Sequence, residues 1–356
     1  MKLVVLFVSI PLAAALAAAA VNYRVDPVAE FYSGAPYAEA VASTPRCLVA
    51  NEVIGSAGYM SFKEDVFRHV RPSTAVIGSS RVLKISSHPR ERDFANLGMP
   101  QMGTKPLLEL MRAVDRMQPR GRPLTLYLGI DFFWFNPGAP KELIDPPFHQ
   151  SFFEKTAYLL SRDNLRRSVR LFRDSRTLAL RGWQREQFGR YCVIDRGEPD
   201  VAWRADGSRL WNFELDPRFP ERTPEPFTTD LTVLRTGLYG HWDGFAWDRL
   251  RQLRTALELA HERGWRVVGF FPPDGARFVR LFSTDSTTAE PWRIFGREVP
   301  AEFRRLGYPF LDFRRIESIP CPETDFVDNG NHTDARCSDR MRARLDEAAR
   351  SVRVPS

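Results

Sequence analysis

The sequence predicts a three-layer α/β/α fold built around a parallel β-sheet. Short apolar segments rich in β-branched and aromatic residues alternate along the chain with longer segments whose apolar residues recur at helical spacing. Strands separated by helices in this rhythm form a parallel sheet with helices on both faces. The hydrophobic content of 43% is sufficient for such a core and argues against a disordered chain.

The first three predicted strands lie in the first half of the chain. STAVIGSS at 73–80 is a β-branched apolar run that ends in turn residues. DFANLGM at 93–99 is a second short strand, and LTLYLGID at 124–131 is a third. Between the last two, a helix is predicted at 106–117 because its apolar residues share one face: Leu107, Leu110, Met111 and Val114.

The second half of the chain continues the alternation. The segment 247–263 predicts an amphipathic helix that stops at Gly264. RVVGFF at 266–271 and YPFLDF at 308–313 are the fourth and fifth strands, and 340–352 is a last helix. Five strands in this rhythm predict the flavodoxin-like order 2-1-3-4-5, with a functional crevice at the carboxyl ends of strands one and three.

The interval 137–232 breaks the alternation and is predicted to be an insertion. It contains a predicted helix pair at 152–180, followed by an irregular part rich in Trp, Arg and Gly. We expect this insertion to lie over the carboxyl edge of the sheet, as a lid or a substrate-binding element.

The N-terminal 21 residues predict export. After Lys2, residues 3–21 carry no charge over 19 positions, which is long enough to cross a bilayer as a helix. The alanine-rich end also offers Ala-x-Ala sites for signal peptidase, so a membrane anchor and a cleaved signal peptide are both open. Residues 22–70 are predicted to be a membrane-proximal stalk and lead-in, and residues 71–356 the α/β domain.

The net charge of the chain does not identify the class of molecule that it binds. The formal net charge is +7 and the pI about 9.4. The basic residues are mixed with acidic ones, and no run of Lys and Arg alone occurs. Together with export, this disfavours nucleic acid and suits an acidic polysaccharide or a membrane surface equally well.

Four cysteines fit an oxidising compartment: Cys47, Cys192, Cys321 and Cys337. An even number in an exported protein favours disulfides, and the spacing is not that of a zinc site. Three pairings are possible, and buried free thiols are the alternative. We favour a bond between Cys321 and Cys337, because it would brace the polar loop between them.

That loop contains the best candidate for a general base. Ser80 lies at the end of the first strand, and a serine hydroxyl needs a nearby base to act as a nucleophile. His332 lies in the polar stretch DFVDNGNHTDA after the fifth strand, and Asp328 precedes it by four residues. One loop would thus supply a base and the carboxylate that orients it. A plain Asx-rich turn and a calcium loop built from Asp328, Asn329, Asn331 and Asp334 are the alternatives.

These residues resemble the SGNH (GDSL-like) hydrolase superfamily, over most of residues 70–350. Four blocks carry the resemblance: residues 78–81 (GSSR), 96–103 (NLGMPQMG), 129–132 (GIDF) and 328–332 (DNGNH). The resemblance implies Ser80 as nucleophile, His332 as base and Asp328 as the orienting carboxylate. It implies an oxyanion hole with a backbone N–H of Gly103, or in second place Gly98. No metal or organic cofactor is expected.

The nearest similarity is to membrane-anchored bacterial cell-envelope relatives of polysaccharide O-acyltransferases and esterases. Such relatives carry Gly-Ser-Ser-Arg, which includes Ser79 and Arg81, and an Asn-Tyr-x-x-Asp-Pro stretch after the anchor, here at 22–27. The resemblance implies an inner-membrane protein with a periplasmic domain that acts on the acyl groups of an envelope or secreted polysaccharide, with an envelope protein complex as a possible setting.

Two departures from the family pattern favour an alternative function. The usual spacing is Asp-x-x-His, so Asp328 is one residue too far from His332, Asn329 lacks the charge, and Asp325 is a further candidate. Asp131 stands where many members place an oxyanion-binding Asn, and a carboxylate there would oppose catalysis unless it is protonated, turned away or paired with Arg81. The alternative is a degenerate scaffold that binds a polymer or a protein partner.

Overall fold

A five-stranded parallel sheet forms the centre of the protein, in the order β3-β2-β4-β7-β8. Counted along the chain, these strands have the order 2-1-3-4-5, so the predicted fold class and strand order are confirmed. In register, Val76 of β2 lies opposite Tyr127 of β4, and Gly129 of β4 lies opposite Phe270 of β7. The strands are β2 (Thr74–Ile77), β3 (Phe94–Asn96), β4 (Thr125–Gly129), β7 (Arg266–Phe271) and β8 (Phe310–Asp312).

The structure is a computed structural model. It describes residues 2–25, 49–50, 56–88, 91–141, 152–175, 201–211, 237–315, 318–319, 321–322, 325–326 and 331–352. Asp328, Cys47 and Cys192, all of which the sequence singled out, lie outside the described residues, as does much of the predicted insertion.

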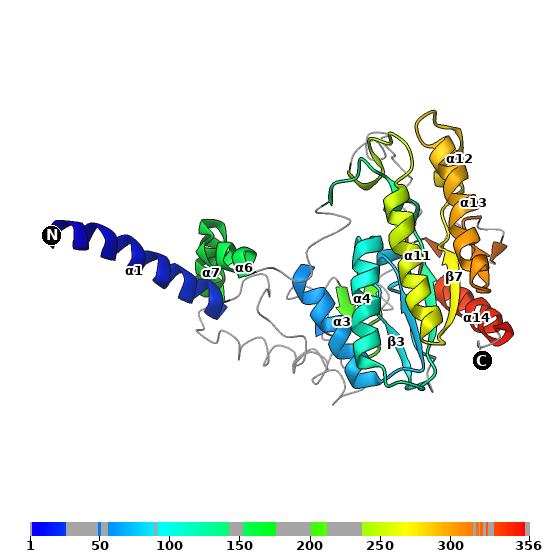
Figure 1. Cartoon of the computed structure of the whole chain (residues 1–356), viewed down its shortest axis with the longest axis horizontal. Helices are drawn as coiled ribbons and strands as arrows, with labels where there is room; N and C mark the ends of the chain where they lie inside the picture. Colours follow the sequence, from blue (N-terminus) through cyan, green and yellow to red (C-terminus); the bar gives the residue numbers. More distant parts are fainter. Residues whose placement is uncertain are drawn as a thin grey trace.

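Helices cover both faces of the sheet and make it the middle layer of three. On one face α3, α4 and α11 lie side by side (Figure 1) and share a continuous core with α13. On the other face α14 packs its buried Met341 and Leu345 against residues such as Val76 and Phe270. The helices are α3 (Ser56–Val70), α4 (Thr104–Met117), α11 (Trp247–Glu262), α12 (Ala276–Thr284), α13 (Ala289–Arg305) and α14 (Ala335–Ser351).

Three of these helices differ from the sequence-based expectation. α3 falls within the predicted stalk at 22–70, yet its Phe62, Val66 and Phe67 are buried in the main core, so this helix belongs to the α/β domain. α12 and α13 were not predicted. α13 contains Pro300 in its interior, a residue that normally breaks a helix and so weakens the sequence signal.

A small antiparallel sheet joins the predicted stalk and the predicted insertion. It has the order β1-β5-β6, with β1 at Val49–Ala50, β5 at Val201–Trp203 and β6 at Arg209–Trp211. The hairpin packs on the central domain through Lys63, whose buried Nζ donates to the carbonyls of Gly207 at 2.6 Å and Asn96 at 3.0 Å. This pairing was not predicted, because strands so far apart in sequence give no local signal.

The helix pair of the insertion packs on the N-terminal helix. α1 (Lys2–Val25) lies against α6 (Phe152–Leu160) and α7 (Arg162–Ser175), away from the central sheet (Figure 1). The fully buried Asn22 fastens them: its Nδ2 donates to the carbonyls of Leu159 and Ser161, and its Oδ1 accepts from Ser168 Oγ at 3.1 Å. The expectation that this helix pair covers the carboxyl edge of the sheet is therefore wrong.

Among the helices that the structure describes, none has both the length and the apolar character required to cross a bilayer. The anchor over residues 3–21 remains a prediction from the sequence.

Candidate functional site

Three adjacent strands bring polar side chains together at one edge of the sheet. Ser80 follows β2, Asp131 follows β4, and Asp274 follows β7. Because β2, β4 and β7 are parallel neighbours, their carboxyl ends meet at the same edge. This is the edge at which open α/β sheets bind their ligands.

The turn after β2 holds Ser80 in a short 3-10 helix, Ser80–Val82. Ser79 precedes it as the N-cap, and its Oγ accepts a hydrogen bond from the Arg81 amide at 3.3 Å. Val82 packs beneath this turn against Gly78 and Gly129. A Cβ at Gly129 would lie 2.4 Å from Val82 Cγ1, and one at Gly78 would lie 2.9 Å from it. The two glycines therefore let the turn sit directly on the strand ends.

Ser80 and His332 are hydrogen-bonded across 252 positions of sequence. Nε2 of His332 lies 2.8 Å from Oγ of Ser80. With the imidazole proton on Nδ1, Nε2 accepts the serine proton, which is the arrangement a general base requires. Ser80 is partly exposed whereas Ser79 is fully buried, so Ser80 is the accessible one of these two serines.

Asn96 supports the serine turn from the neighbouring strand. It is fully buried, and its Nδ2 donates to the carbonyls of Val82 at 2.7 Å and Ile85 at 2.8 Å. Its Oδ1 accepts from the amide of Gly98 at 2.9 Å, so that amide is already engaged. Gly103 is the N-cap of α4, at the helix end whose amides favour negative charge. The engagement of the Gly98 amide disfavours Gly98 as an oxyanion donor, and Gly103 stays the predicted donor.

Asp131 pairs with Arg81, so its negative charge is offset by the guanidinium and is not a free charge beside Ser80. Both side chains are buried, and Arg81 Nη1 donates to Asp131 Oδ1 at 2.8 Å. Arg81 Nη2 also lies 2.7 Å from Oδ1 of the buried Asp274. Burial raises the pKa of Asp274 to about 6, although Arg81 acts in the opposite direction.

Tyr239 reaches the same cluster from the segment after the insertion. The buried Asn136 holds this segment, because its Nδ2 donates to the carbonyls of Leu238 at 2.9 Å and Gly240 at 2.7 Å. Burial raises the pKa of Tyr239 above its usual range, with Arg81 acting in the opposite direction, and the tyrosine is hydrogen-bonded to the side chain of Asn331. Tyr239 is therefore a neutral hydroxyl hydrogen-bonded to Asn331, the residue immediately before His332.

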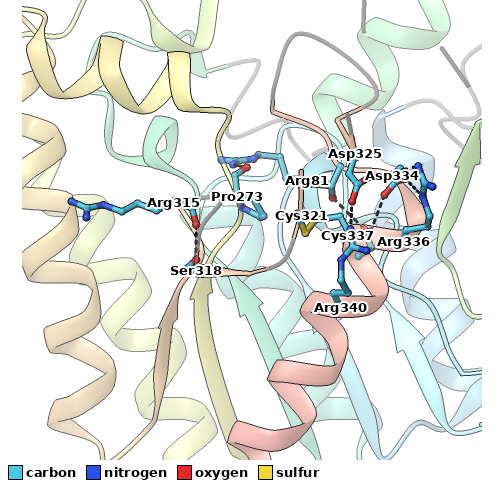
Figure 2. The surroundings of a disulfide bond; sticks show 12 residues. Arg81, Pro273, Arg315, Ser318, Cys321, Asp325, Asp334, Arg336, Cys337 and Arg340 are labelled. Carbon is cyan, nitrogen blue, oxygen red and sulfur yellow. Dashed lines mark hydrogen bonds and ion pairs between the residues drawn. A yellow bond between two sulfur atoms is a disulfide. The ribbon is translucent and has the colours of Figure 1, made fainter. Parts of the chain in front are cut away.

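The loop that carries His332 is fastened on both sides (Figure 2). A disulfide joins Cys321 to Cys337, with Cα atoms 5.4 Å apart, so the predicted pairing is confirmed. A β-bridge pairs Phe326 with Thr333, and the amide of Asp334 donates to the carbonyl of Asp325 at 2.6 Å. Together these contacts hold the chain on either side of the loop.

Asp325 and Asp334 serve this loop rather than the imidazole. The buried Asp325 carboxylate pairs with Arg340 and, at 3.6 Å, with Arg336 (Figure 2). Asp334 caps α14: its Oδ1 accepts from the Cys337 amide at 2.8 Å, and its Oδ2 pairs with Arg336. Both oxygens of Asp334 are thus engaged, which weakens the calcium-loop alternative.

Among the described residues, no group of three or more His, Cys, Asp or Glu side chains is arranged to hold a metal ion.

Removal of the disulfide is expected to loosen this loop. Replacing Cys321 and Cys337 together by serine should lower the free energy of unfolding by about 3 kcal/mol, because a crosslink over a loop of this size restricts the unfolded chain. Denaturant unfolding measures the effect, and peptide mapping without reduction should recover the linked peptide. Free thiols at both positions in protein purified from an oxidising compartment would contradict the brace.

Three members of the cluster were absent from the sequence-based site: Asn96, Tyr239 and Asp274. Asn331 was considered there only as a ligand of the calcium-loop alternative. Asp274 follows the fourth predicted strand, so its position at a strand end was an available signal. Asn96 lay inside a quoted block but was given no role. Tyr239 reaches the site only through the fold.

Neither a scan against protein-family models nor a search of curated proteins finds a match to this chain. The geometry of the site therefore stands as the basis for its function.

Proposed function

We propose that this protein is an exported serine esterase or O-acyltransferase that acts on acyl groups of a cell-envelope or secreted polysaccharide. The observation that carries the proposal is the 2.8 Å hydrogen bond between Ser80 Oγ and His332 Nε2, at the carboxyl edge of a parallel sheet. A serine hydroxyl paired with an imidazole at such an edge is the arrangement used for nucleophilic acyl transfer.

The reaction proceeds through an acyl-enzyme. His332 Nε2 takes the proton of Ser80 as Oγ forms a bond to the acyl carbonyl carbon, and the oxyanion develops near the amides of Ser80 and Gly103. The C–O bond to the departing alcohol then breaks, and His332 returns the proton to that alcohol. Water or a sugar hydroxyl attacks the acyl-enzyme by the reverse steps, which gives hydrolysis or transfer. Asp328 orients the imidazole.

The main alternative is a scaffold that binds a polymer or a partner without chemistry, and Asp131 was the residue that favoured it. The ion pair of Asp131 with Arg81 weakens that alternative, because the carboxylate charge is offset beside the serine turn. The Ser80–His332 pair favours the enzyme, because a binding scaffold has no need of it.

Residues 3–21 and the disulfide support the proposed location. The uncharged N-terminal segment suits an inner-membrane anchor, and a disulfide between Cys321 and Cys337 suits the oxidising periplasm. A soluble protein released after signal cleavage is the alternative.

A fluorophosphonate probe tests the proposed function directly. Incubation of the full-length protein in detergent should label Ser80, because a serine activated by His332 attacks phosphorus as it attacks an acyl carbonyl. Peptide mapping identifies the labelled residue. Ser79→Ala is the matched control and should still be labelled, whereas His332→Ala should be labelled far more slowly. An unlabelled wild type would favour the scaffold, and label on another residue would displace Ser80 as the nucleophile.

A further inference from the structure

Arg81 occupies the centre of the candidate site, although it has no place in the acyl-transfer steps. Its side chain is 4% exposed and lies at the carboxyl ends of β2, β4 and β7. The guanidinium is anchored on Asp131 and Asp274. It also donates from Nη2 to the carbonyls of Pro272 and Pro273, of which Pro273 is drawn in Figure 2.

One further hydrogen bond links Arg81 to the catalytic loop. Its Nε donates at 3.0 Å to the carbonyl of Asn331, the residue immediately before His332. Arg81 is itself the residue immediately after Ser80. A single side chain therefore ties together the backbones next to the nucleophile and next to the base, which are 252 positions apart in sequence.

The charge state of Arg81 excludes a role in proton transfer. Burial opposes its charge, but the neighbouring Asp274 and Asp131 more than compensate, so the pKa of Arg81 is raised above its already high usual range. The guanidinium stays protonated wherever the protein is folded. Its contribution is therefore geometric.

We propose that Arg81 is a positioning residue that holds His332 in register with Ser80, through its bond to the Asn331 carbonyl and its anchorage on Asp131 and Asp274. This inference rests on the proposed acyl-transfer function. Because Arg presents its donors in a rigid planar fork and Lys is a flexible point charge, Lys cannot bind all of these acceptors at once.

The test compares Arg81→Lys with Arg342→Lys in the full-length protein. Arg342 is a matched control because its side chain is also buried and paired with two carboxylates, Asp346 and Glu91, while it packs on the Phe94 ring. Arg81→Lys should lower kcat for p-nitrophenyl acetate about 100-fold, the cost of a displacement near 1 Å, with KM almost unchanged. Arg342→Lys should lower the unfolding midpoint and leave kcat unchanged.

Hydrogen exchange supplies a readout that needs no turnover. Peptides containing His332 should exchange faster in Arg81→Lys than in the wild type or in Arg342→Lys, because the loop loses the bond to its Asn331 carbonyl. If Arg81→Lys does not fold, Asp274→Asn, which removes one anchor and keeps the guanidinium, should show the same two effects at a smaller size.

The outcomes separate this inference from the proposed function. A wild type without turnover or fluorophosphonate label refutes the acyl-transfer function, and the exchange comparison still decides whether Arg81 holds the loop. An active wild type with unchanged kcat and unchanged exchange in Arg81→Lys overturns the positioning role. So does a loss of kcat of the same size in Arg342→Lys.

Discussion

Ser80→Ala is expected to lower turnover of an acyl ester such as p-nitrophenyl acetate by about 10⁶-fold in kcat, the effect of losing the nucleophile of a serine triad. The adjacent Ser79 is not placed to replace it. Ser79 is fully buried, and its Oγ accepts the hydrogen bond from the Arg81 amide at 3.3 Å. The measurement is the initial rate of nitrophenol release by the full-length protein in detergent.

Ser79→Ala is the matched control for this prediction. It removes an N-cap hydrogen bond from the turn that carries Ser80, which costs about 1 kcal/mol of stability and leaves the nucleophile in place. Most of the turnover should remain. Equal rates for the wild type and Ser80→Ala would remove the enzyme interpretation for that substrate.

Asp328→Asn is expected to lower kcat about 10⁴-fold, because the imidazole then loses the carboxylate that fixes its tautomer and stabilises its charged form. The prediction rests on the sequence position of Asp328, four residues before His332. His332 is itself placed on Ser80, so the orienting group must come from the other side of the ring. Steady-state kinetics of the purified variant measure the loss.

Asp325→Asn tests the other candidate for the orienting carboxylate. The carboxylate of Asp325 is engaged by Arg340 and Arg336, so its replacement should lower the thermal unfolding midpoint and leave kcat nearly intact. If Asp325→Asn loses activity and Asp328→Asn keeps it, the orienting carboxylate has been assigned to the wrong residue.

Ser80 and His332 are held by different kinds of element. Ser80, the proposed nucleophile, lies at the ends of three adjacent strands together with Arg81 and two carboxylates. The proposed base, His332, comes from a loop held by a disulfide and by two ion pairs. Rigid strand ends fix the position of Ser80. The sequence of the loop is rich in polar residues that offer little apolar surface for packing, so we expect crosslinks such as this disulfide to stabilise it.

The sequence alone was sufficient to predict the strands of the central sheet and their order. The strand at 266–271 is observed with the predicted bounds, and the helices α4 and α11 begin and end within two residues of the predicted limits. Buried parallel strands and amphipathic helices leave strong local periodicity, and the right-handed crossover rule leaves few ways to order them. The same reasoning placed Ser80 at a strand end and singled out His332 among six histidines.

Only the tertiary structure decided the contacts between distant parts of the chain. The pairing of β1 with β5, the packing of α6 and α7 on α1, and the approach of Tyr239 to Asn331 join segments that share no local pattern. The role of Asp131 was also decided by the fold. The sequence left a degenerate site and a pair with Arg81 both open, and the structure places Arg81 2.8 Å from Asp131. Sequence periodicity records which face of an element is buried, but the partner of a buried charge depends on which strand ends meet, and that is a property of the folded chain.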